Sequence, residues 1–518
     1  MIDVFFDMQM KYNITRDSFI GGKRSWSCCW YMSPIFVCVM AVILLCGCRF
    51  KQSAEFCAYA QSSDNHIIHA VSDLSHSFSF YADGRFGSQY MKGYPCLSNW
   101  GNLYEQDLEN ANLLILLGCD ERLSYTPADI RTIQAFVEEG GGVVIMGKYG
   151  SNPQNELAEK FGATFCGTTD EPLIVAGFEL DSIAAQGSPS YLHFEYPDKW
   201  EPIVCTDNGK SVLAVSQVGK GRVLVASRSL AGSHPNASDS INVTLWKPLL
   251  QYITSGKKVD PERAFATKGW DDLGNKICKY GLNVNYSDYM EPYAASMIDV
   301  TSRCMPFIEK RMGVPLSEGM GTSIMLLPTG GGGFSAGDVI ALAAWWGGFP
   351  EREDAMIEFI THESVHSWVL PYPEIWNEPI ATYIGDLVMA DMGHPEESAR
   401  LIASCIDRGR AADPTFSLYD INGKSSHQGV PDLPADKVND LHWGKSFWIF
   451  EQLRKENPDF VADYFRAKRK YASAGLQKYD ANNTVVVLSI AMKRNLFPWF
   501  RSIGFDVNEE EAEIKLTL

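Results

Sequence analysis

The spacing of apolar and polar residues predicts buried strands in the first half of the chain. Residues 111–118, Ala-Asn-Leu-Leu-Ile-Leu-Leu-Gly, form a continuous apolar run typical of a strand buried on both faces of a parallel sheet. The Thr-Pro pair at 126–127 then begins a helix, with the threonine as N-cap and Asp129 in a variant of the capping box. Three glycines at 140–142 end the helix, and residues 143–146 form the next strand. This order predicts a βαβ unit.

Two later segments complete the α/β domain that we expect between residues 65 and 256, after a linker at 49–64. Residues 219–226 contain a glycine turn followed by an apolar strand. Residues 242–254 have the apolar spacing of a closing helix. The predicted fold class of this part is a flavodoxin-like α/β domain.

Helical patterns dominate the second part, which we expect to span residues 257–518 as a mainly α-helical α+β domain. Residues 355–370, AMIEFITHESVHSWVL, run without proline or glycine until Pro371, and apolar side chains surround the helix. Such a pattern predicts a buried helix. A second helix is predicted from Asn377 to Asp386, with a proline in its first turn.

The first of these helices carries a His-Glu-x-x-His motif at His362, Glu363 and His366. Positions i and i+4 lie on one face of a helix, so the two imidazoles can bind one metal ion. The intervening glutamate can then reach a water molecule at the metal. Polar groups in so apolar a helix need a partner, and the motif predicts a single catalytic Zn²⁺.

A catalytic zinc site needs a third protein ligand and an open position for water. Glu378, near the start of the second helix, follows His366 with eleven residues between, which is enough chain to return a carboxylate over the first helix. Glu374 is the alternative third ligand. Asp386 is a candidate hydrogen-bond partner that would orient a ligand histidine.

These residues predict a hydrolytic mechanism. Zinc lowers the pKa of a water that it binds to roughly 7, and Glu363 would accept a proton from that water and pass it to the leaving amine. The oxyanion needs a further donor, for which His442 and Tyr383 are candidates. Either of these two could equally be a structural residue.

Four consecutive glycines, Gly330 to Gly333, precede Phe334 about thirty residues before the metal motif. Glycines permit close backbone approach and leave backbone N–H groups open to a ligand. Residues Gly331, Gly332, Gly333 and Phe334 are therefore candidates for an edge that pairs with an extended substrate. The alternative is a flexible loop.

Together, these motifs resemble the enhancin-like, mucin-degrading gluzincin metallopeptidases (the M-sixty family). The resemblance rests on the metal motif, on Leu-Pro-Thr-Gly-Gly-Gly-Gly-Phe-Ser-Ala-Gly-Asp at 327–338, and on the closing segment 495–507. It covers roughly residues 261–518, with Ser502-Ile503 standing where a tryptophan is frequent in the family. The resemblance implies a zinc endopeptidase that cleaves mucin-like, O-glycosylated proteins.

The α/β domain resembles class I glutamine amidotransferase-like domains, which accompany enhancin-like peptidases in the TRP-channel-associated factors. In the amidotransferases the nucleophile occupies a Gly-x-Cys-x-Gly elbow. Here Cys119, in Gly-Cys-Asp-Glu at 118–121, lacks the second glycine. We therefore expect this domain to be non-catalytic and to act as a scaffold or recognition module.

The N-terminus predicts export. Lys23 and Arg24 precede an apolar run at 30–46, and Leu-Cys-Gly-Cys at 45–48 is similar to a bacterial lipobox. Residues 1–48 would then be a signal segment that leaves the chain tethered through a lipid on Cys48, at a bacterial cell surface or in the periplasm. An uncleaved signal anchor is the alternative.

Composition restricts the partners. A formal net charge of −18 argues against nucleic acid or an anionic membrane surface as the main partner. The expected partner is a glycoprotein or peptide substrate, and the oligomeric state stays open. Two alternative functions stay open as well: a non-catalytic glycan- or protein-binding surface lipoprotein, and a zinc exopeptidase acting on short peptides.

Overall fold

The computed structural model describes residues 54–517 apart from several short segments. Those segments are 62–65, 77–85, 87–89, 118–121, 176–182, 184, 186, 232–239, 264, 266–272, 316–322, 337–338 and 369–374. The predicted export segment with Cys48, the predicted elbow at Cys119 and the alternative ligand Glu374 all lie outside the described residues.

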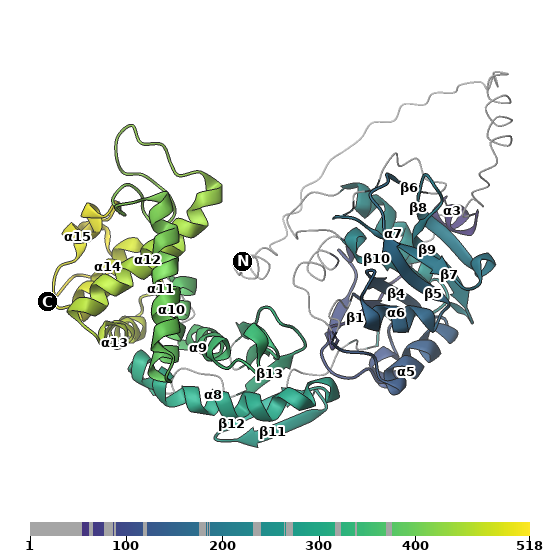
Figure 1. The fold of residues 1–518 in the computed structure, drawn as a ribbon, viewed down its shortest axis with the longest axis horizontal. Coiled ribbons are helices and arrows are strands. Elements are labelled where there is room, and N and C mark those ends of the chain that lie inside the picture. Colours follow the sequence, from purple (N-terminus) through teal and green to yellow (C-terminus); the bar gives the residue numbers. More distant parts are fainter. Residues whose placement is uncertain are drawn as a thin grey trace. The chain divides into compact units, whose positions relative to one another are not determined.

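The larger sheet has ten strands, and its backbone path runs β2-β1-β3-β4-β10-β9-β7-β5, with β8 joined to β9 and β6 to β8 (Figure 1). Strands β2, β1, β3, β4 and β10 are mutually parallel, and the others pair antiparallel. The strand bounds are β1 Ala70–Asp73, β2 Cys96–Asn99, β3 Leu113–Leu116, β4 Gly142–Gly147, β5 Ala163–Thr168, β6 Leu173–Val175, β7 Ser190–Phe194, β8 Trp200–Thr206, β9 Ser211–Val218 and β10 Gly221–Ser227.

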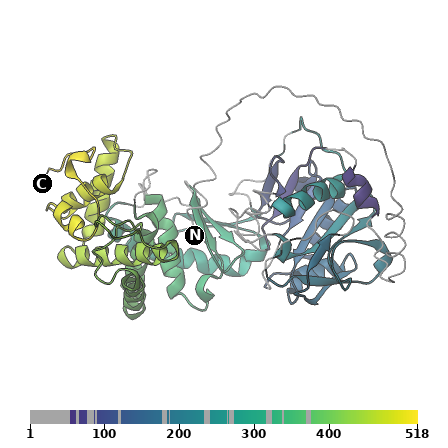
Figure 2. The same cartoon turned by 90° about the horizontal axis from the view of Figure 1, so that it is seen from above.

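Helices cover both faces of the parallel strands (Figures 1 and 2). Leu114 and Leu116 of β3 pack in one core with α5 (Pro127–Glu138) and α6 (Asn152–Glu159). Leu113 and Ile115 pack in another core with α7 (Ser240–Thr254). Successive side chains of a strand point to opposite faces, so the continuous apolar run predicted this burial on both sides.

The predicted βαβ unit is confirmed, because α5 lies in sequence between the parallel neighbours β3 and β4. The hydroxyl of Thr126 accepts a hydrogen bond from the backbone N–H of Asp129, as the capping pattern predicted. The structure thus supports a mixed α/β layout for this part of the chain.

Within the segment predicted as a linker at 49–64, the described residues 54–61 form a helix, α3 (Ala54–Gln61). Phe56 of α3 is fully buried, and its ring lies 5.5 Å from that of Tyr252 on α7. Its backbone N–H donates to Glu201 on β8 at 3.0 Å. Burial of one phenylalanine, worth about 1.5–3 kcal/mol, joins this short helix to the domain that follows.

The second part of the chain contains a smaller sheet and most of the helices. The sheet order is β11-β12-β13-β15-β14, with bounds β11 Asn275–Lys279, β12 Leu282–Tyr286, β13 Ser323–Leu327, β14 Phe334–Ala336 and β15 Val339–Ala343. The helices are α8 Glu291–Met312, α9 Asp354–Trp368, α10 Asn377–Asp391, α11 Pro395–Ala412, α12 Ala435–Glu456, α13 Phe460–Ser473, α14 Ala481–Ala491 and α15 Phe497–Ser502. One continuous apolar core joins α8, the inner strands and the helices that follow.

Strand β14 ends the order of the smaller sheet and pairs antiparallel with β15. It follows directly after the glycine run, and Gly332 has a φ of +95°, which glycine adopts without strain. Helix α9 packs against both β14 and β15, which places the metal motif beside the sheet edge.

Within the described residues, no helix is both long and apolar enough to cross a membrane.

Candidate metal centre

Helix α9 presents His362 and His366 on the same face, as their spacing predicted. Apolar residues on its other faces, including Met356, Ile360 and Val365, are buried in the surrounding core. The two imidazole rings lie nearly perpendicular, with their centroids 4.8 Å apart. Their Nε2 atoms face one another at 3.1 Å, so both rings point to the same place.

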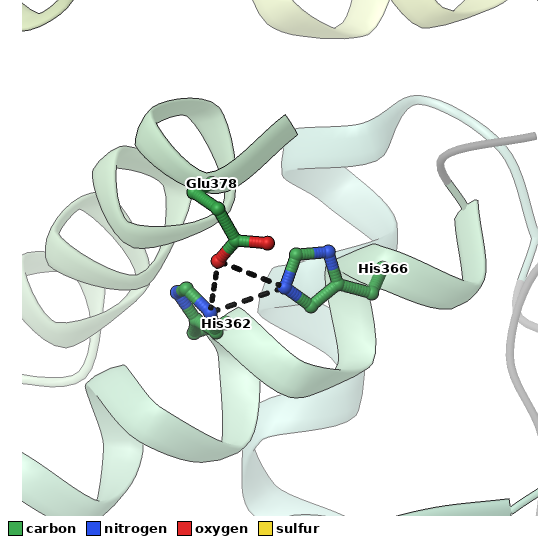
Figure 3. Close-up of side chains that lie close together, drawn as sticks. All are labelled: His362, His366 and Glu378. Atoms are coloured by element: carbon green, nitrogen blue, oxygen red, sulfur yellow. Dashed lines mark hydrogen bonds and ion pairs between the residues drawn. The ribbon is translucent and has the colours of Figure 1, made fainter. Parts of the chain in front are cut away.

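Glu378, in the first turn of α10, completes the group (Figure 3). Its Oε2 lies 3.3 Å from Nε2 of His362 and 3.5 Å from Nε2 of His366. Asn377 donates to the other carboxylate oxygen at 3.2 Å, which holds the group in orientation. No second set of three possible His, Cys, Asp or Glu ligands gathers anywhere in the part of the chain that the structure describes.

The three distances suit a tetrahedral metal. Zinc binds imidazole nitrogen and carboxylate oxygen at about 2.0–2.1 Å, and a tetrahedron of that size has edges of about 3.3–3.4 Å. The observed separations are 3.1, 3.3 and 3.5 Å. Two neutral nitrogens and one carboxylate are also a donor set that zinc prefers. The residues present therefore fit a zinc ion.

Burial and mutual pairing shape the charges of this group. Burial lowers the pKa of His362 and favours the neutral imidazole that a metal needs. Burial acts the same way on His366, but the adjacent Glu378 carboxylate outweighs it and raises the pKa of that imidazole. Burial also disfavours charge on Glu378, yet the two histidines hold its pKa well below the usual range. The ligand carboxylate is thus ionised.

Glu363 lies beside the ligands and is only 2 % exposed. Burial raises the pKa of its carboxyl to about 8. Among the described residues its Oε2 has no hydrogen-bond partner. A buried carboxyl oxygen without a partner is costly in a folded protein, and such groups concentrate at functional sites.

Gly333, the last residue of the glycine run, lies close to the Glu363 carboxyl group. A Cβ atom built on Gly333 would overlap the carbonyl oxygen of Ala341 and lie 2.7 Å from the Phe359 ring and 3.1 Å from Glu363 Oε1. Ser335 of β14 and Ser367 of α9 are in hydrogen-bond contact at 3.1 Å. The edge strand is therefore held against α9 next to Glu363, where only glycine fits.

A pair of glycine substitutions tests this close approach. We expect Gly333→Ala to lower the free energy of unfolding by about 1–3 kcal/mol, because the added methyl group overpacks the contact between β14 and α9. Gly331→Ala is the matched control, since a Cβ at that position meets nothing within 4 Å. Urea unfolding of both variants measures the difference, and equal stability of the two would contradict the packing.

Polar side chains lie along the facing sides of helices α9 and α10, starting from the candidate metal ligands. On each helix the residues are spaced four apart: His366, His362 and Glu358 on α9, and Glu378, Thr382 and Asp386 on α10. Thr382 Oγ1 lies 2.8 Å from Nδ1 of His362. The structure therefore gives the histidine-orienting contact to Thr382, and Asp386, predicted for it, lies one turn further along. Sequence reasoning missed Thr382, although its position four residues after Glu378 on the same helix face is a usable signal.

Asp386 has a different environment from the one predicted. It is 2 % exposed, and its Oδ1 has no hydrogen-bond partner among the described residues. Burial, with repulsion from Glu358, raises its pKa to about 8. Burial likewise raises the pKa of Glu358 to about 8.

The buried Asp386 carboxyl makes stability depend on pH. The unfolded side chain loses its proton near pH 3.9. The folded one keeps it until about pH 8, so the folded state holds more protons between these values and its stability falls as pH rises through this window. We expect Asp386→Asn to gain stability over the wild type between pH 5 and pH 9 by on the order of 2–4 kcal/mol. Urea unfolding of the metal-free proteins at both pH values checks this, and parallel pH profiles for the two proteins would refute it.

Neither predicted oxyanion donor is one of the three residues of the metal group. Tyr383 is fully buried, and its hydroxyl donates to Glu451 on α12 at 2.7 Å. Because α10 turns about 100° per residue, Tyr383 faces the helical core rather than the ligand side occupied by Glu378. His442 on α12 lies with Nδ1 3.2 Å from the carbonyl oxygen of Ile421. Neither residue joins the metal group, and the structure assigns Tyr383 a packing role.

Comparisons with known proteins do not identify the chain. No protein-family model and no curated protein matches it. Similar solved structures include the mmIFT52 N-terminal domain, at 13% identity over 36% of this chain and 97% of that chain, with a TM-score of 0.28. A cytoplasmic protein from Salmonella typhimurium is similar at 13% identity over 36% of this chain and 99% of that chain, with a TM-score of 0.27. At these TM-scores the similarities carry no argument, and function must be argued from the site.

Proposed function

We propose that this chain is a zinc-dependent endopeptidase of the gluzincin type. The observation that carries the proposal is the convergence of His362 Nε2, His366 Nε2 and Glu378 Oε2 at separations of 3.1–3.5 Å beside the buried carboxyl of Glu363. These three residues would hold the ion, which when bound supplies a Lewis acid that activates water and polarises a carbonyl.

Glu363 acts as the general base and acid in this proposal. Its carboxyl adjoins the ligands and has an unpartnered oxygen within the described structure, so it can accept a proton from the attacking water. The same proton then passes to the amine that leaves. Burial raises the pKa of this carboxyl in the metal-free protein, and a bound cation beside it would favour the ionised form that accepts the proton.

Strand β14 is the proposed substrate-binding edge. In the sheet as described it pairs with β15 on one side only, so its other side can accept an extended peptide. Residues Gly331, Gly332, Gly333 and Phe334 lead into it, and Gly333 brings the backbone next to Glu363. An extended substrate would thereby pass beside the general base, as an endopeptidase requires.

The remaining parts of the proposal come from the resemblance to enhancin-like peptidases and from the N-terminal pattern. The substrates are O-glycosylated, mucin-like proteins, and the enzyme acts outside the cytoplasm, tethered through Cys48. The α/β domain serves as a non-catalytic scaffold or recognition module.

One experiment separates the three functions that the sequence leaves open. We expect the purified chain to contain a single zinc ion and to cut a mucin internally, with activity lost on chelation and restored by added zinc. An unglycosylated protein is digested in parallel, and mass spectrometry maps the cut sites. Trimming from free ends only would indicate an exopeptidase, and a zinc-loaded protein that cuts nothing would indicate a binding protein. Absence of zinc would overturn the proposal.

A further inference from the structure

We infer that Thr382 is a positioning residue for the metal centre, fixing the ring of His362 so that its Nε2 faces the ion. This inference rests on the proposed function and names a residue outside the ligand set. Its basis is the 2.8 Å contact between Thr382 Oγ1 and His362 Nδ1.

The contact selects one form of the imidazole. A neutral histidine carries its proton on one ring nitrogen and a lone pair on the other. The Nε2 of His362 lies 3.3 Å from Glu378 Oε2 and 3.1 Å from the Nε2 of His366, so it is the nitrogen turned toward the ligand group. With Nδ1–H donating to the threonine hydroxyl, the lone pair falls on Nε2, where a metal needs it.

The position of Thr382 on helix α10 determines the geometry of its contact with His362. Thr382 follows Glu378 by four residues, so the carboxylate ligand and the hydroxyl that orients a histidine project from one face of one helix. Gly385, further along α10, packs against Glu358 of α9 so closely that a Cβ there would lie 2.7 Å from the Glu358 carbonyl oxygen. The close packing of the two helices fixes the position of Thr382 relative to His362.

The two histidines are therefore supported differently. His362 is 8 % exposed and is held from behind by a hydroxyl on another helix. The contacts of His366 are with His362 and Glu378 themselves and with the side chain of Asn377, the neighbour of Glu378 in the first turn of α10. Loss of the Thr382 hydroxyl should consequently loosen the ligand whose orientation depends on it, while the other ligands stay in place.

The test compares three threonine substitutions. Thr382→Val keeps the shape and removes the hydroxyl, and we expect the zinc dissociation constant to rise about 10- to 100-fold. Thr382→Ser restores the hydroxyl and should return the affinity to within about threefold of the wild type. Thr361→Val is the matched control, because Thr361 is a fully buried threonine on α9 directly before His362, and its hydroxyl has no hydrogen-bond partner among the described residues.

Zinc affinity is measured by competition with a chromogenic chelator, and the cobalt-substituted proteins are compared by visible absorption. A changed cobalt spectrum for Thr382→Val alone, with apo-protein unfolding unchanged, supports positioning. Equal affinities and spectra for Thr382→Val and the wild type would overturn this inference and leave the proposed function standing. A wild type that binds neither metal would instead overturn the proposed function. If Thr382→Val fails to fold, Thr382→Ala takes its place: weakened affinity and an altered spectrum in that variant would support the inference, and values identical to the wild type in both would count against it.

Discussion

Glu363→Gln is expected to lower the rate of peptide hydrolysis by about 10²–10⁴-fold while leaving zinc content unchanged. The amide has the size of the carboxyl but cannot take a proton from the attacking water. Glu363 is not one of the three converging ligands, so the ion should stay bound. The measurement pairs initial rates on a peptide substrate with metal analysis of the same preparation.

Glu363→Gln tests the catalytic role of this residue directly, because we expect the variant to fold as the wild type does. Glu363 is almost fully buried, and burial penalises its charged form, so a neutral amide suits the same position. Glu358→Gln is the matched control: another carboxyl on α9, partly buried and also with a pKa near 8, one turn before His362. The control should keep activity within a few-fold of the wild type. Activity above a tenth of the wild type in Glu363→Gln would contradict the role of general base.

The two helices that carry the candidate metal ligands were predictable from sequence, because the patterns that indicate them involve residues close together in the chain. A fixed spacing of four residues places His362 and His366 on one face, and Pro371 ends the pattern of the first helix. The first observed helix, α9 (Asp354–Trp368), begins one residue before its predicted start. The second, α10 (Asn377–Asp391), begins at the predicted residue and continues five residues past the predicted end at Asp386. The βαβ unit was predictable for the same reason, because its apolar run and its capping residues are adjacent in sequence.

Contacts between elements were harder to predict. Asp386 and Thr382 lie one turn apart on the same face of α10. Which of them contacts His362 depends on how α9 and α10 are aligned along their axes, and that alignment places Thr382 next to the histidine. Tyr383 follows Thr382 directly, but a rotation of about 100° per residue carries its hydroxyl to Glu451. Sequence spacing sets the face of a helix and leaves the packing partner undetermined.

The linker failed as a prediction for a related reason. Polar and small residues surround Phe56, so the segment has little amphipathic pattern of its own. Its helix is stabilised by tertiary packing of two aromatic side chains, Phe56 and Tyr59, against Tyr252, which no local sequence pattern predicts.

Replacement of the third ligand is expected to have the other large effect, on zinc affinity. Glu378→Gln removes the negative charge that both histidines face at 3.3 and 3.5 Å. We expect affinity to fall by more than the roughly 10- to 100-fold that follows loss of an outer hydrogen-bond partner, because a direct ligand is lost. Hydrolysis at low zinc should fall in parallel, and competition with a chelator measures the change.

The companion variant Glu374→Gln decides between the two glutamates that spacing alone allows. Glu378 lies in the first turn of α10, and its Oε1 accepts a hydrogen bond from the Asn377 side chain at 3.2 Å, which orients the carboxylate. With Glu378 as the ligand, Glu374→Gln should bind zinc within a few-fold of the wild type. The opposite ranking, with Glu374→Gln weak and Glu378→Gln normal, would transfer the ligand role to Glu374. That result would also mean that the group of His362, His366 and Glu378, with its separations of 3.1–3.5 Å, is an ion-paired cluster and not a metal site, because loss of the Glu378 carboxylate would not change zinc affinity.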